Sequence, residues 1–230
     1  MNETYKVQVQ DLVDDLKAVF THAGLGGEAG EYKLLTQSFL YKFLNDKFLY
    51  QAKVLDESNT YENLLAMSEE DYDWLLEDIG TSAAWLKPDQ LIESLHRQQN
   101  EATFYETFEN TLNQIAIDNN DIFSVHTDGD TAIRLFDERL ITDTISDSSK
   151  RNEVAKAIIN LLARVKFDET IFSQGFDFFS TLFEYMIKDY NKDGGGKYAE
   201  YYTPHSVAKI IADILVGNDQ PSNVRIYDPS

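Results

Sequence analysis

Apolar residues recur every three to four positions along almost the whole chain, and this spacing restricts the possible fold more than any other feature. The first apolar stripe comprises Tyr5, Val9, Leu12, Val13, Leu16 and Phe20. Because an α-helix turns once in about 3.6 residues, side chains at this spacing share one face that can be buried. Segments with the two-residue period of a half-buried strand are few. The pattern therefore predicts a mainly α-helical protein.

Further helices are expected along residues 1–165, which we predict to form a helical bundle. The second helix carries two adjacent apolar stripes, and these predict deep burial. Ser68 and Asp71 have the spacing of an acidic capping box, Gly80 is placed to end the helix that they begin, and Pro88 is expected as a first helical residue. The stripes are Leu35, Phe39 and Phe43 beside Leu40, Leu44 and Phe48; Tyr72, Leu75, Leu76 and Ile79; Leu91, Ile92 and Leu95; Phe104, Phe108, Leu112 and Ile115; Val154, Ile158, Leu161, Leu162 and Val165.

Three other stretches differ in character from the predicted bundle helices. Residues 122–140 contain an Asp-Gly turn signal and fit a small hairpin or an irregular loop equally well. A helix is expected over residues 176–190. The glycine-rich segment 191–196 then ends that helix and is a candidate linker or loop, so a boundary is expected near it.

The charge balance argues against direct DNA binding by this chain alone. It has 40 acidic and 20 basic residues, a formal net charge of −20 at pH 7, and such a surface repels phosphate backbones. Between Asp56 and Gly80 nine residues are Asp or Glu and none is Lys or Arg, which is typical of a solvated helical surface and also fits a basic partner subunit. The modest candidates for DNA backbone contacts are Lys150, Arg151, Lys156 and Arg164.

Composition excludes several classes of site. The hydrophobic share of 43% supplies enough core material for a folded protein. The sequence has no cysteine, which excludes disulfides and cysteine nucleophiles and suits a reducing compartment. It shows neither a signal peptide nor a run of about 18 apolar residues, so a soluble, cytoplasmic protein is expected. The four scattered histidines predict no metal site.

The clearest motif lies in the last part of the chain. Glu200-Tyr201-Tyr202-Thr203-Pro204-His205 precedes one helix, and β-prone residues 224–227 then lead into Asp228-Pro229-Ser230. Thr203 is expected to cap that helix, Pro204 to be its first residue and Gly217 to end it. Its buried face is expected to comprise Val207, Ile210, Ile211, Ile214 and Leu215.

This order of elements resembles the N6-adenine DNA methylases, whose catalytic domain opens with a Tyr/Phe-Tyr-Thr-Pro element and, after one helix, a strand that ends in Asp-Pro. Upstream, residues 37–44 and 175–185 resemble the helical N-terminal domain of the modification subunits of type I restriction-modification systems. The resemblance implies transfer of a methyl group from S-adenosylmethionine to adenine N6 in DNA. It also implies assembly with a specificity subunit, with or without a restriction subunit, so that DNA is engaged through the complex.

The resemblance further implies a domain organisation and a cofactor site. Residues 166–230 are expected to form a connecting helix and the truncated start of a Rossmann-like α/β methyltransferase domain. No Asn-Pro-Pro-Tyr/Phe motif, which family members use to hold the flipped adenine, is present, so no residue is expected to be catalytic and this chain alone is expected to be inactive. The cofactor-binding residues implied are Glu200, Tyr201, Tyr202, Thr203, Pro204, His205, Asp228, Pro229 and Ser230.

Each of these residue types suits one part of S-adenosylmethionine. Aromatic faces suit the sulfonium and the adenine, and the free N–H groups of a helix start, with the Thr203 hydroxyl, suit the carboxylate. Asp228 at a strand end suits the ribose hydroxyls or the ammonium group. A plainer interpretation is that Thr203 only caps a helix, that the tyrosines pack against the bundle, and that His205 is an exposed side chain. Tyr198 after Lys197 breaks the P-loop pattern, which excludes that nucleotide site.

Two other functions remain open from the sequence. The helical part fits a protein–protein assembly module without catalysis. The acidic surface fits a decoy that mimics DNA, although the Tyr-Tyr-Thr-Pro and Asp-Pro elements would have no role in such a decoy. The coding sequence that follows Ser230 would separate the enzyme from the module.

Overall fold

The computed structural model describes residues 2–26, 29–120, 135–167, 171–172, 185, 203 and 205–217. Within these ranges the chain forms nine α-helices and two short 3₁₀ helices, and no β-strand. This confirms the prediction of a mainly α-helical protein. The chain divides into two compact units, Met1–Phe178 and Phe179–Ser230, which are described separately. The predicted strand at 224–227, the linker at 191–196 and most of the helix over 176–190 lie outside the described residues.

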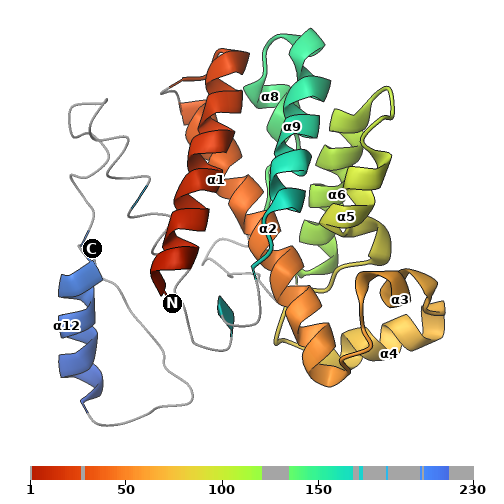
Figure 1. The fold of residues 1–230 in the computed structure, drawn as a ribbon, viewed down its shortest axis with the longest axis vertical. Helices are drawn as coiled ribbons and strands as arrows, with labels where there is room; N and C mark the ends of the chain where they lie inside the picture. Colours follow the sequence, from red (N-terminus) through yellow and green to blue (C-terminus); the bar gives the residue numbers. More distant parts are fainter. Residues whose placement is uncertain are drawn as a thin grey trace, which may run out of the picture. The chain divides into compact units, whose positions relative to one another are not determined.

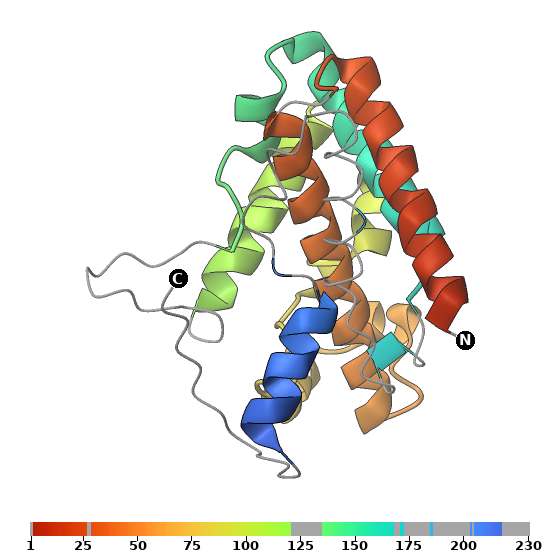
Figure 2. The same ribbon diagram turned by 90° about the vertical axis from the view of Figure 1, so that its left-hand side faces the viewer.

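The first unit is a bundle in which long helices pack side by side. Helices α1 (Asn2–Ala23) and α9 (Arg151–Arg164) lie alongside one another in both views, and α2 (Ala29–Leu55) passes behind them (Figures 1 and 2). Helices α5 (Ile92–Gln98) and α6 (Phe104–Asp118) pack against α9. The predicted stripe of α1 is buried, apart from the half-buried Tyr5. The apolar period therefore identified the inner face of this helix correctly.

Helix α2 has buried residues along most of its length, in agreement with the deep burial that its two apolar stripes predict. Leu35, Phe39, Leu44 and Phe48 are buried, and Leu40 and Phe43 are half-buried. The burial also extends to polar residues that the apolar pattern did not predict, and these are Glu31, Ser38, Lys42, Asn45 and Asp46. Because a charge is costly to bury unless it is paired, this helix requires compensating polar contacts inside the bundle.

A buried ion pair provides those contacts. The Lys42 ammonium lies 2.9 and 3.0 Å from the two carboxylate oxygens of Asp46, and both side chains are almost fully buried. Asp46 also accepts hydrogen bonds from the Asn45 amide at 2.8 Å and from the backbone N–H of Phe167 at 2.9 Å. The Asp46 carboxylate thus joins the middle of α2 to the chain that leaves α9.

The shorter helices confirm most of the predicted start and stop signals. Helix α3 (Tyr61–Ala66) precedes α4 (Glu69–Ile79), which is capped by Ser68. The Ser68 hydroxyl accepts from the N–H of Asp71 at 3.2 Å, and Gly80, with φ of +54°, ends the helix. Both features were expected from the sequence.

Two predicted boundaries differ from the structure. Pro88 does not begin α5; it begins the 3₁₀ helix η1 (Pro88–Gln90), and α5 starts at Ile92. A short 3₁₀ turn before a helix tightens the chain at its entry, and a proline fits either kind of first turn. Val165 was expected in the last helix of the bundle but follows α9, whose last residue is Arg164. Helix ends inferred from periodicity carry this uncertainty of one or two residues.

The connection between α4 and α5 is held by asparagine side chains from other elements. Asn119, directly after α6, accepts from the Trp85 N–H at 2.6 Å and donates to the Trp85 carbonyl at 2.8 Å. Asn45 of α2 accepts from the N–H of Ile92 at 2.9 Å. Side-chain amides here replace the backbone partners that a regular element would provide.

The undecided stretch 122–140 is described only from residue 135 onward. Phe136 is buried, and the short helix α8 (Leu140–Thr144) follows, before the 3₁₀ helix η2 (Ser148–Lys150) leads into α9. Residues 135–139 form neither a helix nor a strand. Among the helices that the structure describes, none combines the length and the apolar character that a membrane span requires.

Candidate cofactor site

Only two of the nine predicted cofactor-binding residues lie in the described part of the chain. Thr203 is exposed, and His205 is the first residue of helix α12 (His205–Val216). The other seven predicted residues, which are Glu200, Tyr201, Tyr202, Pro204, Asp228, Pro229 and Ser230, lie outside the described residues. The convergence of these side chains on one ligand therefore stays a prediction.

Helix α12 has the position and the end that the motif predicts. The described helix begins at His205, and Pro204, which was expected to be its first residue, lies outside the described residues; Gly217 follows its last residue with φ of +61°. The Gly217 N–H donates to the Asp213 carbonyl at 3.0 Å. A positive φ is favourable for glycine because it lacks a Cβ, so Gly217 ends the helix as predicted.

The aliphatic face of α12 differs from expectation. Its five predicted core residues are exposed by 43% at Val207, 58% at Ile210, 49% at Ile211, 75% at Ile214 and 80% at Leu215. The prediction that this face is buried is therefore wrong for this chain. A helix buries an apolar stripe only where another element packs against it, and apolar periodicity alone does not specify that element.

The N-terminus of α12 has the electrostatic character that a carboxylate ligand requires. Its first turn contains neither Asp nor Glu. The first N–H groups of any helix lack partners within the helix and carry partial positive charge. The exposed Thr203 adds a hydroxyl two residues before the helix starts. These features fit the amino-acid end of S-adenosylmethionine.

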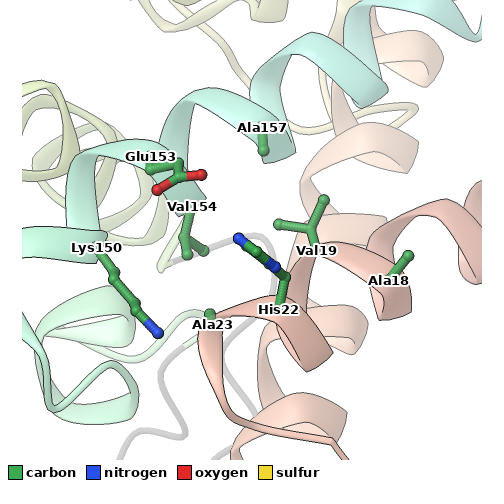
Figure 3. Close-up of a pocket in the computed structure, with 8 residues that line it drawn as sticks. All are labelled: Ala18, Val19, His22, Ala23, Lys150, Glu153, Val154 and Ala157. Atoms are coloured by element: carbon green, nitrogen blue, oxygen red, sulfur yellow. The ribbon is translucent and has the colours of Figure 1, made fainter.

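The first unit contains a small cavity that is unrelated to these residues. It has a volume of about 270 Å³ and lies between α1 and the start of α9 (Figure 3). Its walls are small apolar side chains, and His22, Lys150 and Glu153 supply the polar groups around it. The volume is just below the range of about 300–1,000 Å³ that is usual for small-molecule sites. None of the predicted cofactor-binding residues lines it.

Two of the four basic residues considered for DNA contacts are engaged within the bundle. Arg151 donates to the carbonyls of Ile145 at 3.0 Å and Thr142 at 3.1 Å, and therefore braces the end of α8. Arg164 pairs with Asp15 of α1 at 3.4 Å. Among the described residues, no group of three or more His, Asp or Glu side chains is placed to hold a metal ion.

Comparison with known families bears on the C-terminal part of the chain. A family model described as N-6 DNA Methylase matches residues 174–230. This confirms that the C-terminal part of the chain resembles the N6-adenine DNA methylases. The family comprises adenine-specific DNA methyltransferases, which in general use S-adenosylmethionine. Neither the curated proteins nor the solved structures contain a match to this chain.

Proposed function

We propose that this chain is part of an adenine-specific DNA methyltransferase of the kind that serves as a type I modification subunit. The family match carries the proposal, because all nine predicted cofactor-binding residues fall inside residues 174–230. Two separate motif elements thus occur in the expected order within the matched segment. The type I assignment rests on the resemblance of residues 37–44 and 175–185 to the N-terminal domain of type I modification subunits.

Within this proposal, the N-terminus of α12 holds the carboxylate of S-adenosylmethionine. Thr203 supplies a hydroxyl, and the free N–H groups of the first turn supply partial positive charge without an opposing acidic residue. Tyr201 and Tyr202 offer aromatic faces to the adenine and the sulfonium, and Asp228 accepts from the ribose or the ammonium group. The bound cofactor supplies an electrophilic methyl group.

The exposed aliphatic face of α12 also has a place in this proposal. In a Rossmann-like domain, helices cover a sheet and bury their apolar stripes against it. Residues Val207 to Leu215 supply such a stripe, and they are exposed in this chain. We place this face against the sheet of the methyltransferase domain.

In this proposal, the chain engages DNA only when it is assembled with other subunits. The net charge of −20 opposes direct contact between this chain and DNA, so a specificity subunit, with or without a restriction subunit, would bring the DNA to the enzyme. A reducing cytoplasmic setting suits a sequence without cysteine.

In the complete enzyme, Thr203→Ala and Asp228→Ala are each expected to weaken binding of S-adenosylmethionine by about 1–3 kcal/mol, because each change removes a polar contact to a charged group. Isothermal titration calorimetry measures the effect, and circular dichroism checks the fold. Ser206→Ala, on the first turn of the same helix, is the matched control and should leave affinity unchanged. If both variants fold and bind S-adenosylmethionine with wild-type affinity, the two motifs contribute to packing and not to cofactor binding.

The isolated chain is expected to transfer no methyl groups, because it lacks an adenine-holding Asn-Pro-Pro-Tyr/Phe motif. The measurement is incorporation of labelled methyl groups into DNA, with and without the partner subunits. Activity of the chain alone contradicts the prediction. The complete protein, assembled with its partners, is tested in the same way. If it is also inactive and binds no cofactor, the result favours the alternative function, a helical assembly module without catalysis.

A further inference from the structure

Exposed apolar side chains in the first unit concentrate around α3 and α4. Of six large hydrophobic residues exposed among its described residues, four fall between positions 54 and 74: Val54, Leu55, Leu65 and Trp74, exposed by 59%, 48%, 42% and 67%. We call the exposed side chains of residues 54–78 the α3–α4 surface. Figure 1 shows these two helices at one end of α2. Clustered apolar exposure of this kind marks contact surfaces more often than isolated exposure does.

Trp74 lies on the outer side of α4. The inner face of that helix is filled by Tyr72, Leu75, Leu76 and Ile79, all of them buried. Trp74 is the most exposed of the four apolar residues, although tryptophan has the largest apolar side chain. Large aromatic side chains that are left in water are over-represented among the residues that anchor protein interfaces.

Carboxylates surround Trp74 on the same helix. Two of them, Glu70 and Asp71, precede Trp74 by four and three positions, and Glu77 and Asp78 follow it by three and four. Residues at these spacings are neighbours on a helix surface. All four are exposed. The nine acidic residues from Asp56 to Asp78 are all described, and only Glu62 has a cationic partner, Arg97, at 3.9 Å. The aromatic face is therefore bordered by uncompensated negative charge.

Elsewhere in the same unit, an arginine already binds an aromatic ring and the carboxylates beside it. The Arg97 guanidinium lies over the Tyr61 ring, 4.7 Å from its centroid, and also approaches the carboxylates of Glu62 and Glu93. One arginine thus stacks on an aromatic ring and meets carboxylates beside it. Around Trp74 the aromatic ring and the carboxylates are present, and the described residues provide no arginine for them.

We propose that the α3–α4 surface docks an arginine-bearing segment of a partner protein, with an arginine side chain stacked on Trp74 and paired with the carboxylates around it. Guanidinium groups are planar, stack on aromatic faces and bind carboxylates in pairs, which ammonium groups do less well. Val54, Leu55 and Leu65, exposed in the same part of the chain, offer further apolar side chains to such a segment. Nucleic acids and anionic membranes are repelled by the same charges. The inference involves only the first unit and does not rest on the methyltransferase assignment.

The test measures binding of a labelled synthetic helical peptide, with arginines on one face and leucines on the other, to the full chain by fluorescence anisotropy. Trp74→Ala is expected to weaken the affinity about tenfold, and so is the triple variant Glu70→Gln, Glu77→Gln, Asp78→Asn. Two variants are matched controls. Ile117→Ala removes an apolar side chain of equal exposure, 66%, on α6. Asp11→Asn, Glu101→Gln, Glu106→Gln removes the same number of exposed charges elsewhere.

Both controls are expected to bind within about twofold of the wild-type chain. If the charge control loses as much affinity as the triple variant, only net charge attracts the peptide. If Trp74→Ala binds the peptide as tightly as the wild-type chain, no arginine stacks on Trp74. Either result overturns the proposal. Hydrogen exchange gives an independent readout, with protection expected within residues 54–78. Absence of peptide binding, or protection spread over other acidic helices, also overturns it.

Discussion

Replacement of Asp46 by alanine is expected to destabilise the bundle by about 3–5 kcal/mol, because it leaves the Lys42 ammonium buried without its counter-ion. Lys42 is 2% exposed, and burial lowers its pKa, while the attraction of Asp46 opposes that shift. Loss of the carboxylate also leaves the backbone N–H of Phe167 and the amide of Asn45 without an acceptor. Urea unfolding followed by circular dichroism measures the change in the free energy of unfolding.

Two comparisons separate the buried charge from other effects. Asp143→Ala breaks an ion pair with Arg139 that has the same four-residue spacing but lies on the surface, and its cost is expected to stay within about 1 kcal/mol. The double variant Lys42→Met, Asp46→Leu removes both charges and should recover much of the lost stability, because no unpaired charge then remains in the bundle. If Asp46→Ala costs no more than Asp143→Ala, the buried pair does not stabilise the fold.

The free energy of unfolding is expected to fall steeply above pH 10, because two buried phenols hold the connection between α4 and α5. Tyr41 donates to the carbonyl of Gln90 at 2.5 Å, and Tyr72 donates to that of Leu86 at 2.6 Å. Burial raises the pKa of both hydroxyls, and the nearby Asp89 raises it further. The folded protein therefore keeps both phenols protonated at a pH where the unfolded chain ionises them.

The direction of this pH dependence follows from the raised pKa values. The contribution of each phenol is fully present below its unfolded pKa of about 10, and it decreases by about 1.4 kcal/mol per pH unit above that value until the folded pKa is reached. Lys42, whose pKa is lowered, acts in the opposite direction, since its buried ammonium costs less as it loses its proton. Lys47, whose pKa burial also lowers, acts in the same direction as Lys42, and both effects end near the unfolded lysine pKa of about 10.4. Above that pH the raised pKa values of the two tyrosines still act, so the net effect is a loss of stability.

The measurement is the free energy of unfolding in urea at a series of pH values between about 8 and 12. The variant Tyr41→Phe, Tyr72→Phe is expected to be less stable than the wild-type chain near neutral pH, by about 1 kcal/mol for each hydrogen bond lost. It should also show a shallower decrease above pH 10. If the wild-type and variant profiles stay parallel through this range, the two phenols do not control the alkaline stability.

Local signals in the sequence predicted the helices and their ends with good accuracy. The inner face of α1, the Ser68 cap, the Gly80 and Gly217 terminators and the existence of α12 all follow from short-range spacing. These features depend on backbone conformation and on contacts within one or two turns, so neighbouring residues are enough to specify them. The cofactor-binding residues, by contrast, are what the resemblance to the N6-adenine DNA methylases implies, and the family match covers the segment that carries them.

Only the tertiary structure decided which of these faces are buried. The apolar spacing did not predict that Lys42 and Asp46 are buried, yet the bundle encloses both side chains. The aliphatic face of α12 was expected to be buried, yet its side chains are exposed. Burial depends on whether another element covers a side chain, and that element can lie anywhere in the sequence or in a partner. The sequence by itself therefore determined where the helices form, and the packing between them decided which of their side chains became core, which became a buried ion pair and which stayed open for contact.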